Sequence, residues 1–129
     1  MIVGGRIDQI EGKRQNENEN MKGLNINITI EDLKADGDSL EIGYTYTATY
    51  NDNVGHLKIK GVLIAKEDKK LVKEIKQEWD KNKKLPDNYA ESTLNVINYS
   101  GSANGTLIAR VLNLSAPLIP PRIQLSAGK

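Results

Sequence analysis

The chain of 129 residues contains no cysteine and no phenylalanine, and His56 is its only histidine. The absence of cysteine excludes disulfides, thiolate metal ligands and cysteine nucleophiles. His56 follows a turn and has no recognisable serine or cysteine motif as a partner, so nothing marks it as a catalytic base. Neither common glycine-rich phosphate-binding pattern occurs. We therefore expect a protein that is not an enzyme and that uses no cofactor and no metal.

A strong charge of one sign and a long apolar run are also missing. The 18 basic and 17 acidic residues leave a net charge of +1, which argues against nucleic acid as the main partner. No stretch approaches the roughly 20 apolar residues of a membrane span, and the first residues lack the apolar core of a signal peptide. These features predict a cytoplasmic protein without an integral membrane segment.

The first half of the chain shows an alternation of apolar and polar residues, which is typical of strands with one buried face. The alternation is clear over residues 23–33 and 39–50, and Asp36-Gly37 between them is a typical hairpin turn. Residues 5–14 form a weaker and more polar strand that suits a sheet edge. Residues 56–65 form the fourth strand. Short turns between sequential strands predict an antiparallel sheet.

In the second half the apolar spacing becomes helical. Asp68 is a suitable N-cap, and Leu71, Val72, Ile75 and Trp79 follow it as one apolar stripe. The lysine-rich segment 66–84 that contains this stripe fits a core-packing helix with a solvated outer face. A helix that binds anionic lipid or nucleic acid is the alternative, which the interleaved acidic residues disfavour.

A second helix is expected from Asp87, with a break or kink at residues 100–105 because two glycines in a short polar run are costly in a helix. A last helix is then expected over 106–114, and the prolines from Pro117 onwards predict an extended tail. Strands followed by helices predict an α+β fold, a four-stranded antiparallel sheet with helices packed on one face. We expect one domain over 1–129, with strands over about 5–66, helices over about 67–115 and a proline-containing tail over 116–129.

Two sets of apolar residues are candidates for binding surfaces. The tyrosines of residues 39–50 share one strand face, which either packs beneath the helices or forms a groove for an apolar or extended peptide. The fourth strand becomes apolar on both faces near its end, which suggests cover from another subunit. The residues that we expect at an oligomer interface are Val62, Ile64, Leu71 and Ile75.

In order and length, these elements resemble the SecB-type export chaperones, most closely a SecB-like protein of archaeal type. The segment GRIDQIEGKR is similar to the first strand of that family, LNINITIEDL and LEIGYTYTATY to the second and third, and HLKIKGVLIA to the fourth. The segment ARVLNLSAPLIPPRIQL resembles the last helix and its proline-containing extension. The resemblance covers roughly residues 5–125.

The resemblance implies an ATP-independent holdase that binds unfolded or non-native polypeptides in apolar grooves and assembles as a homotetramer, a dimer of dimers. Bacterial members engage the translocation motor through an acidic tail, whereas this sequence stops at SAGK, so we do not expect motor binding. The side chains that we expect to line the client groove are Tyr44, Tyr46, Tyr50, Leu63, Trp79, Leu85 and Tyr89.

Two other functions remain open at this point. The first is a dedicated interaction module for one partner, for example a chaperone for an unstable antitoxin. The second is an enzyme with Asp or Glu acid–base chemistry, which ranks last because the sequence contains no paired-carboxylate motif.

Overall fold

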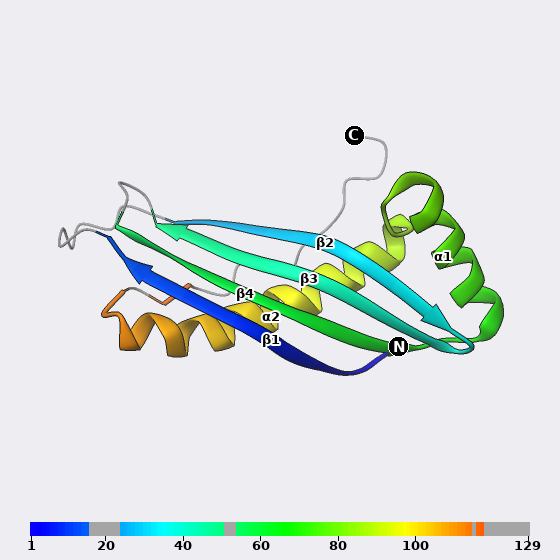
Figure 1. Cartoon of the computed structure of the whole chain (residues 1–129), viewed down its shortest axis with the longest axis horizontal. Helices are drawn as coiled ribbons and strands as arrows, with labels where there is room; N and C mark the ends of the chain where they lie inside the picture. The colour runs from blue at the N-terminus through cyan, green and yellow to red at the C-terminus, as the bar shows by residue number, and fades with distance from the viewer. Residues whose placement is uncertain (16–23, 51–53, 115, 118–129) are drawn as a thin grey trace.

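The computed structural model describes residues 1–15, 24–50, 54–114 and 116–117. Over these residues, four strands form one antiparallel sheet and two helices cover one of its faces (Figure 1). The predicted α+β architecture is therefore confirmed. The elements are β1 (Ile2–Arg14), β2 (Leu24–Asp36), β3 (Ser39–Tyr50), β4 (Gly55–Lys66), α1 (Lys69–Asn82) and α2 (Asp87–Val111).

The strand order in the sheet is β1-β4-β3-β2, so β1 and β2 form its two edges. The first strand begins at Ile2, earlier than predicted, and pairs with β4 along its whole length. The hairpin between β2 and β3 turns at Gly37, whose φ of 61° lies in the left-handed region that glycine adopts without a steric cost. The turn that the sequence suggests at residues 51–53 lies outside the described residues.

The core lies between the helices and the apolar face of the two central strands. Paired residues of an antiparallel sheet share a face, and the pairs Tyr46–Ile59 and Ala48–Leu57 both face the helices and are buried. Burying one large apolar side chain contributes about 1.5–3 kcal/mol. This face of the sheet therefore holds the helices in place.

Helix α1 begins where the sequence predicts. Its N-cap is Asp68, whose carboxylate accepts a hydrogen bond from the Leu71 N–H at 2.8 Å. At the other end, Lys83 adopts a left-handed conformation, and its N–H donates to the Trp79 carbonyl at 2.8 Å. The helix stands at one end of the sheet, beside the hairpin that joins β2 to β3 (Figure 1).

Helix α2 runs unbroken from Asp87 to Val111, so the predicted break at residues 100–105 and the separate helix over 106–114 are wrong. Gly101 faces the sheet, and a Cβ atom on it would lie 2.3 Å from Cδ2 of the Tyr46 ring. The glycine therefore allows the helix backbone to pack directly on the sheet. Burial against the sheet outweighs the loss of about 1 kcal/mol in helix propensity.

The proline-containing tail expected over 116–129 falls outside the described residues beyond position 117. Pro117 itself is fully buried. A Cβ atom on Gly105 would lie 2.9 Å from Cγ of Pro117, so this proline packs directly on α2.

Candidate polypeptide-binding surfaces

Most of the side chains expected in a client groove are buried in this structure. Tyr89 is half-buried, and its hydroxyl donates to the Glu67 carboxylate at 3.1 Å. Tyr44 and Leu63 line one open cavity between β1 and α2. Six of the expected residues are at most 6 % exposed: Tyr44, Tyr46, Tyr50, Leu63, Trp79 and Leu85.

The buried tyrosines are neutral at ordinary pH. Burial raises the pKa of Tyr44 and of Tyr46, and it raises the pKa of Tyr50 to about 12. Burial likewise raises the pKa of Tyr89. These shifts have burial as their main cause, which agrees with a packing role for the tyrosine rings.

Tyr46→Ala should lower the free energy of unfolding by about 3–5 kcal/mol, the range for deleting a buried aromatic ring. The reason is that Tyr46 has no exposed surface and touches α2 at Gly101. Urea unfolding measures the loss. Glu74→Ala, at an exposed position of α1 outside both the core and the surfaces described below, is the control and should change stability by less than about 0.5 kcal/mol. A Tyr46→Ala protein of unchanged stability but weaker client binding would instead place this ring in the groove.

The residues expected at an oligomer interface occupy three different environments. Val62 and Ile64 are half-buried on the sheet face that points away from the helices, where Val62 pairs with Gly43 of β3. Leu71 is half-buried on α1, whereas Ile75 is fully buried within the chain. In this conformation Ile75 has no surface to offer a second subunit.

The structure exposes an apolar stripe on α2 that the sequence analysis missed. Tyr99, Leu107 and Val111 are 66 %, 62 % and 85 % exposed, and they share one side of the helix with the partly exposed Val96. No charged residue occurs between Glu91 and Arg110. A surface helix normally carries charges on its outer side, so this uncharged run was the available sequence signal.

The stripe continues onto the edge strand β1. Ile7 and Ile10 pair with residues of β4 whose own partners in β3 are Tyr44 and Tyr46, which places both isoleucines on the helix side of the sheet. Both are exposed, Ile10 by 55 %. A cavity of about 420 Å³ separates β1 from α2 at this place. We call the exposed side chains Ile7, Ile10, Val96, Tyr99, Leu107 and Val111 the α2–β1 surface.

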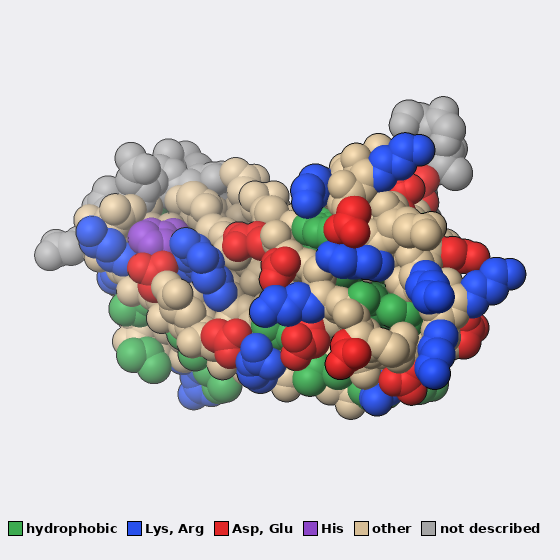
Figure 2. Space-filling view, turned by 45° about the vertical axis from the view of Figure 1, so that its right-hand side comes forward, with side chains coloured by type: hydrophobic (Ala, Val, Ile, Leu, Met, Phe, Trp, Pro, Cys, Tyr) green, Lys and Arg blue, Asp and Glu red, His purple; other side chains and the backbone are tan. Residues whose placement is uncertain are grey.

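Hydrophobic and charged side chains are distributed unevenly over the molecule. In Figure 2, a group of hydrophobic side chains lies at the lower left, and smaller hydrophobic areas lie along the lower edge and right of the centre among Lys, Arg, Asp and Glu. The C-terminal half of α2 lies at the lower left in Figure 1. Exposed apolar surface of this extent commonly marks an interaction site.

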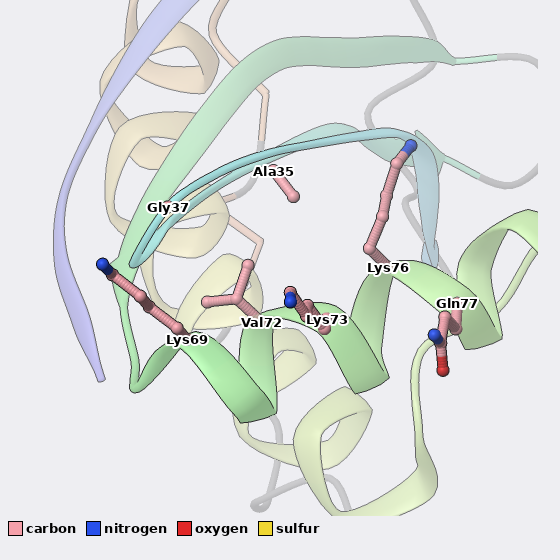
Figure 3. A pocket seen from close by; sticks show the side chains of 7 residues that line it. All are labelled: Ala35, Gly37, Lys69, Val72, Lys73, Lys76 and Gln77. Atoms are coloured by element: carbon pink, nitrogen blue, oxygen red, sulfur yellow. The ribbon is translucent and has the colours of Figure 1, made fainter.

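A second concave surface lies between α1 and the end of the other edge strand, β2. This groove has a volume of about 290 Å³. The Lys76 side chain extends across the groove, and its ammonium group donates to the Leu33 carbonyl at 3.2 Å. Its lining residues, shown in Figure 3, are Ala35, Gly37, Lys69, Val72, Lys73, Lys76 and Gln77. We call it the lysine groove.

In the described parts of the chain, no group of three or more histidine or acidic residues could hold a metal ion. The described helices include none that is both long and apolar enough to cross a membrane. The described residues do show exposed apolar side chains, two edge strands and surface charge.

The architecture of the chain is a SecB-like α+β fold, in which a four-stranded antiparallel sheet precedes two helices on one face. The solved structure of the Mycobacterium tuberculosis SecB-like chaperone Rv1957, in complex with a ChAD peptide from the Rv1956 HigA1 antitoxin, matches this chain with a TM-score of 0.64. The match covers 96 % of this chain and 87 % of that chain, at 8 % sequence identity.

At this low identity the likeness concerns the fold. The predicted SecB-like architecture is confirmed, while the archaeal branch of the resemblance is not addressed by this neighbour. The chain matches no protein-family model and no curated protein sequence.

Proposed function

We propose that this protein is an ATP-independent holdase that binds unfolded or non-native polypeptides and prevents their aggregation. The observation that carries the proposal is the SecB-like fold, because a solved protein with this fold holds a peptide from a partner protein. Holding a chain requires apolar surface and hydrogen-bonding edges, and it requires no catalytic group. In this proposal the protein acts in the cytoplasm, by binding alone.

We assign the α2–β1 surface to contacts between copies of this chain. The surface is uncharged and lies along a long helix beside an edge strand. Such a surface can pair with itself about a two-fold axis, in which each copy contributes the same residues. A tetramer built as a dimer of dimers would bury it and keep the assembly soluble.

The opposite edge of the sheet, formed by β2, is then available to clients. This strand is the second edge, and the alternating isoleucines Ile26, Ile28 and Ile30 are half-buried on its helix side. An extended client can add main-chain hydrogen bonds to a strand edge while its side chains contact such a row. The two edges of the sheet thus serve different partners.

A dedicated chaperone for one partner is the second candidate. It is favoured by the peptide in the Rv1957 structure, which comes from a single antitoxin. The two candidates use the same surface and differ in the range of sequences that they accept.

An aggregation assay with several unrelated unfolded proteins tests the proposal. We expect the purified protein to suppress aggregation of most of them, and added ATP to leave the suppression unchanged because no phosphate-binding loop is present in the sequence. An inert protein at equal mass concentration is the control. Protection of one client alone would favour the dedicated chaperone, and protection of none would contradict both candidates.

A further inference from the structure

The lysine groove has apolar walls and a cationic rim. Ala35 of β2 and Val72 of α1 face one another across it, and Lys76 extends from α1 to β2 (Figure 3). Lys69, Lys73 and Lys76 occupy successive turns on the side of α1 that borders the groove. The arrangement brings three ammonium groups beside a strip of apolar surface at an edge strand.

The positive charge of this groove is only partly neutralised. Lys76 forms an ion pair with Asp80 at 3.0 Å. Neither Lys69 nor Lys73 forms an ion pair with any residue that the structure describes. The nearby Asp68 caps α1, and Asp38 pairs with Lys66 at 3.4 Å. Two ammonium groups therefore remain available to an incoming anionic group.

We propose that the lysine groove binds acidic segments of extended clients, which gives this protein a preference for polypeptides that carry Asp or Glu at alternate positions. The inference rests on the proposed holdase function and names the class of sequence that it favours. Acidic side chains would pair with Lys69 and Lys73, and neighbouring small apolar side chains would pack on Ala35 and Val72.

The spacing of the lysines supports this occupant. Residues four apart on a helix are separated by about 6 Å along its axis. Alternate residues of an extended chain are separated by about 6.6 Å and point to the same side. Two carboxylates at positions i and i+2 of an extended client can therefore reach Lys69 and Lys73 together.

Nucleic acid fits the same charges less well. Single strands are usually held by exposed aromatic rings on which bases stack, whereas no aromatic residue that the structure describes lines the lysine groove. The apolar walls at Ala35 and Val72 have no counterpart in a phosphate backbone, and the net charge of the chain is only +1. These features favour an acidic polypeptide.

The test compares two labelled unfolded peptides that are identical except for Glu or Gln at two alternate positions. Fluorescence anisotropy with the full chain at low salt should show about 10-fold tighter binding of the Glu peptide, equivalent to about 1.4 kcal/mol. The advantage should shrink at high salt, because the screening length falls from about 30 Å at 0.01 M to about 3 Å at 1 M.

Matched variants locate the effect. The double variant Lys69→Gln/Lys73→Gln should bind both peptides equally, with the affinity of the wild-type protein for the Gln peptide. The control Lys70→Gln/Lys81→Gln removes the same charge from α1 at positions that do not line the groove, and it should keep the preference. Thermal unfolding of both variants verifies that they fold.

The remaining outcomes separate this inference from the function on which it rests. Equal binding of both peptides by the wild-type protein would overturn the acidic preference and leave the holdase intact. Failure to bind either peptide would contradict both. A single-stranded oligonucleotide is the last probe. If its binding depends on Lys69 and Lys73 more strongly than the binding of the Glu peptide does, the choice of a polypeptide occupant is overturned.

Discussion

Gly101→Ala should lower the free energy of unfolding by about 1–3 kcal/mol, the usual range for overpacking a core. The added methyl group would lie 2.3–2.6 Å from three atoms of the Tyr46 ring, which is fully buried. The sign of the change is informative, because alanine is favoured over glycine by about 1 kcal/mol inside an unpacked helix. Urea unfolding with a fixed m-value measures it.

Two variants calibrate this experiment. Glu74→Gly, at an exposed interior position of α1 that lies away from the α2–β1 surface, should cost about 0.5–1 kcal/mol and reports helix propensity without packing. Gly4→Ala, at a β1 position where a Cβ atom would meet nothing within 4 Å, should be close to neutral. If Gly101→Ala stabilises the protein, α2 does not pack on Tyr46, and the close contact between helix and sheet is absent in solution.

Leu107→Glu should dissociate the proposed oligomer. The side chain is 62 % exposed in the isolated chain, so the substitution should leave the fold intact. In an assembly, the substitution would place a carboxylate in an uncharged interface, and burying it costs several kcal/mol per ion. Symmetry repeats this cost in each copy of the chain. Light scattering at micromolar concentration should show about four chains per particle for the wild-type protein, and one or two for Leu107→Glu.

Two further variants locate the interface. Asn88→Glu adds the same charge to the exposed first turn of α2 and should leave the particle mass unchanged. Val62→Glu tests the outer face of the sheet, where sequence patterning suggested an interface. Dissociation by Val62→Glu but not by Leu107→Glu would move the interface from the α2–β1 surface to that face. A wild-type protein that is monomeric would contradict the oligomer itself.

The candidate site could be predicted from the sequence only in part. The tyrosine face of residues 39–50 was recognised, with burial and an open groove as the alternatives, and Tyr46 and Tyr50 are buried in the structure. The lysines of segment 66–84 were predicted to lie on the solvated side of a helix. Their position beside β2 follows from the docking of α1 against a strand some 40 residues earlier, which no local pattern encodes.

The sequence by itself determined the type and order of the four strands and the start of the first helix. The two-residue alternation of side chains predicted strands over 23–33 and 39–50, which the structure contains as β2 and β3, and the Asp68 cap predicted the start of α1. These signals are local, because the backbone geometry of strands and helix ends acts over a few residues.

Only the tertiary structure decided how those elements meet. The pairing of β1 with β4 joins residues that are more than 40 positions apart. Gly101 locally favours a helix break, but in the structure it lies inside α2 and packs closely on Tyr46 of the sheet. The exposure of Leu107 and Val111 likewise depends on which side of α2 turns to the sheet. Burial is a property of neighbours brought together by folding, so the binding surfaces emerge only when the whole sheet and both helices are in place.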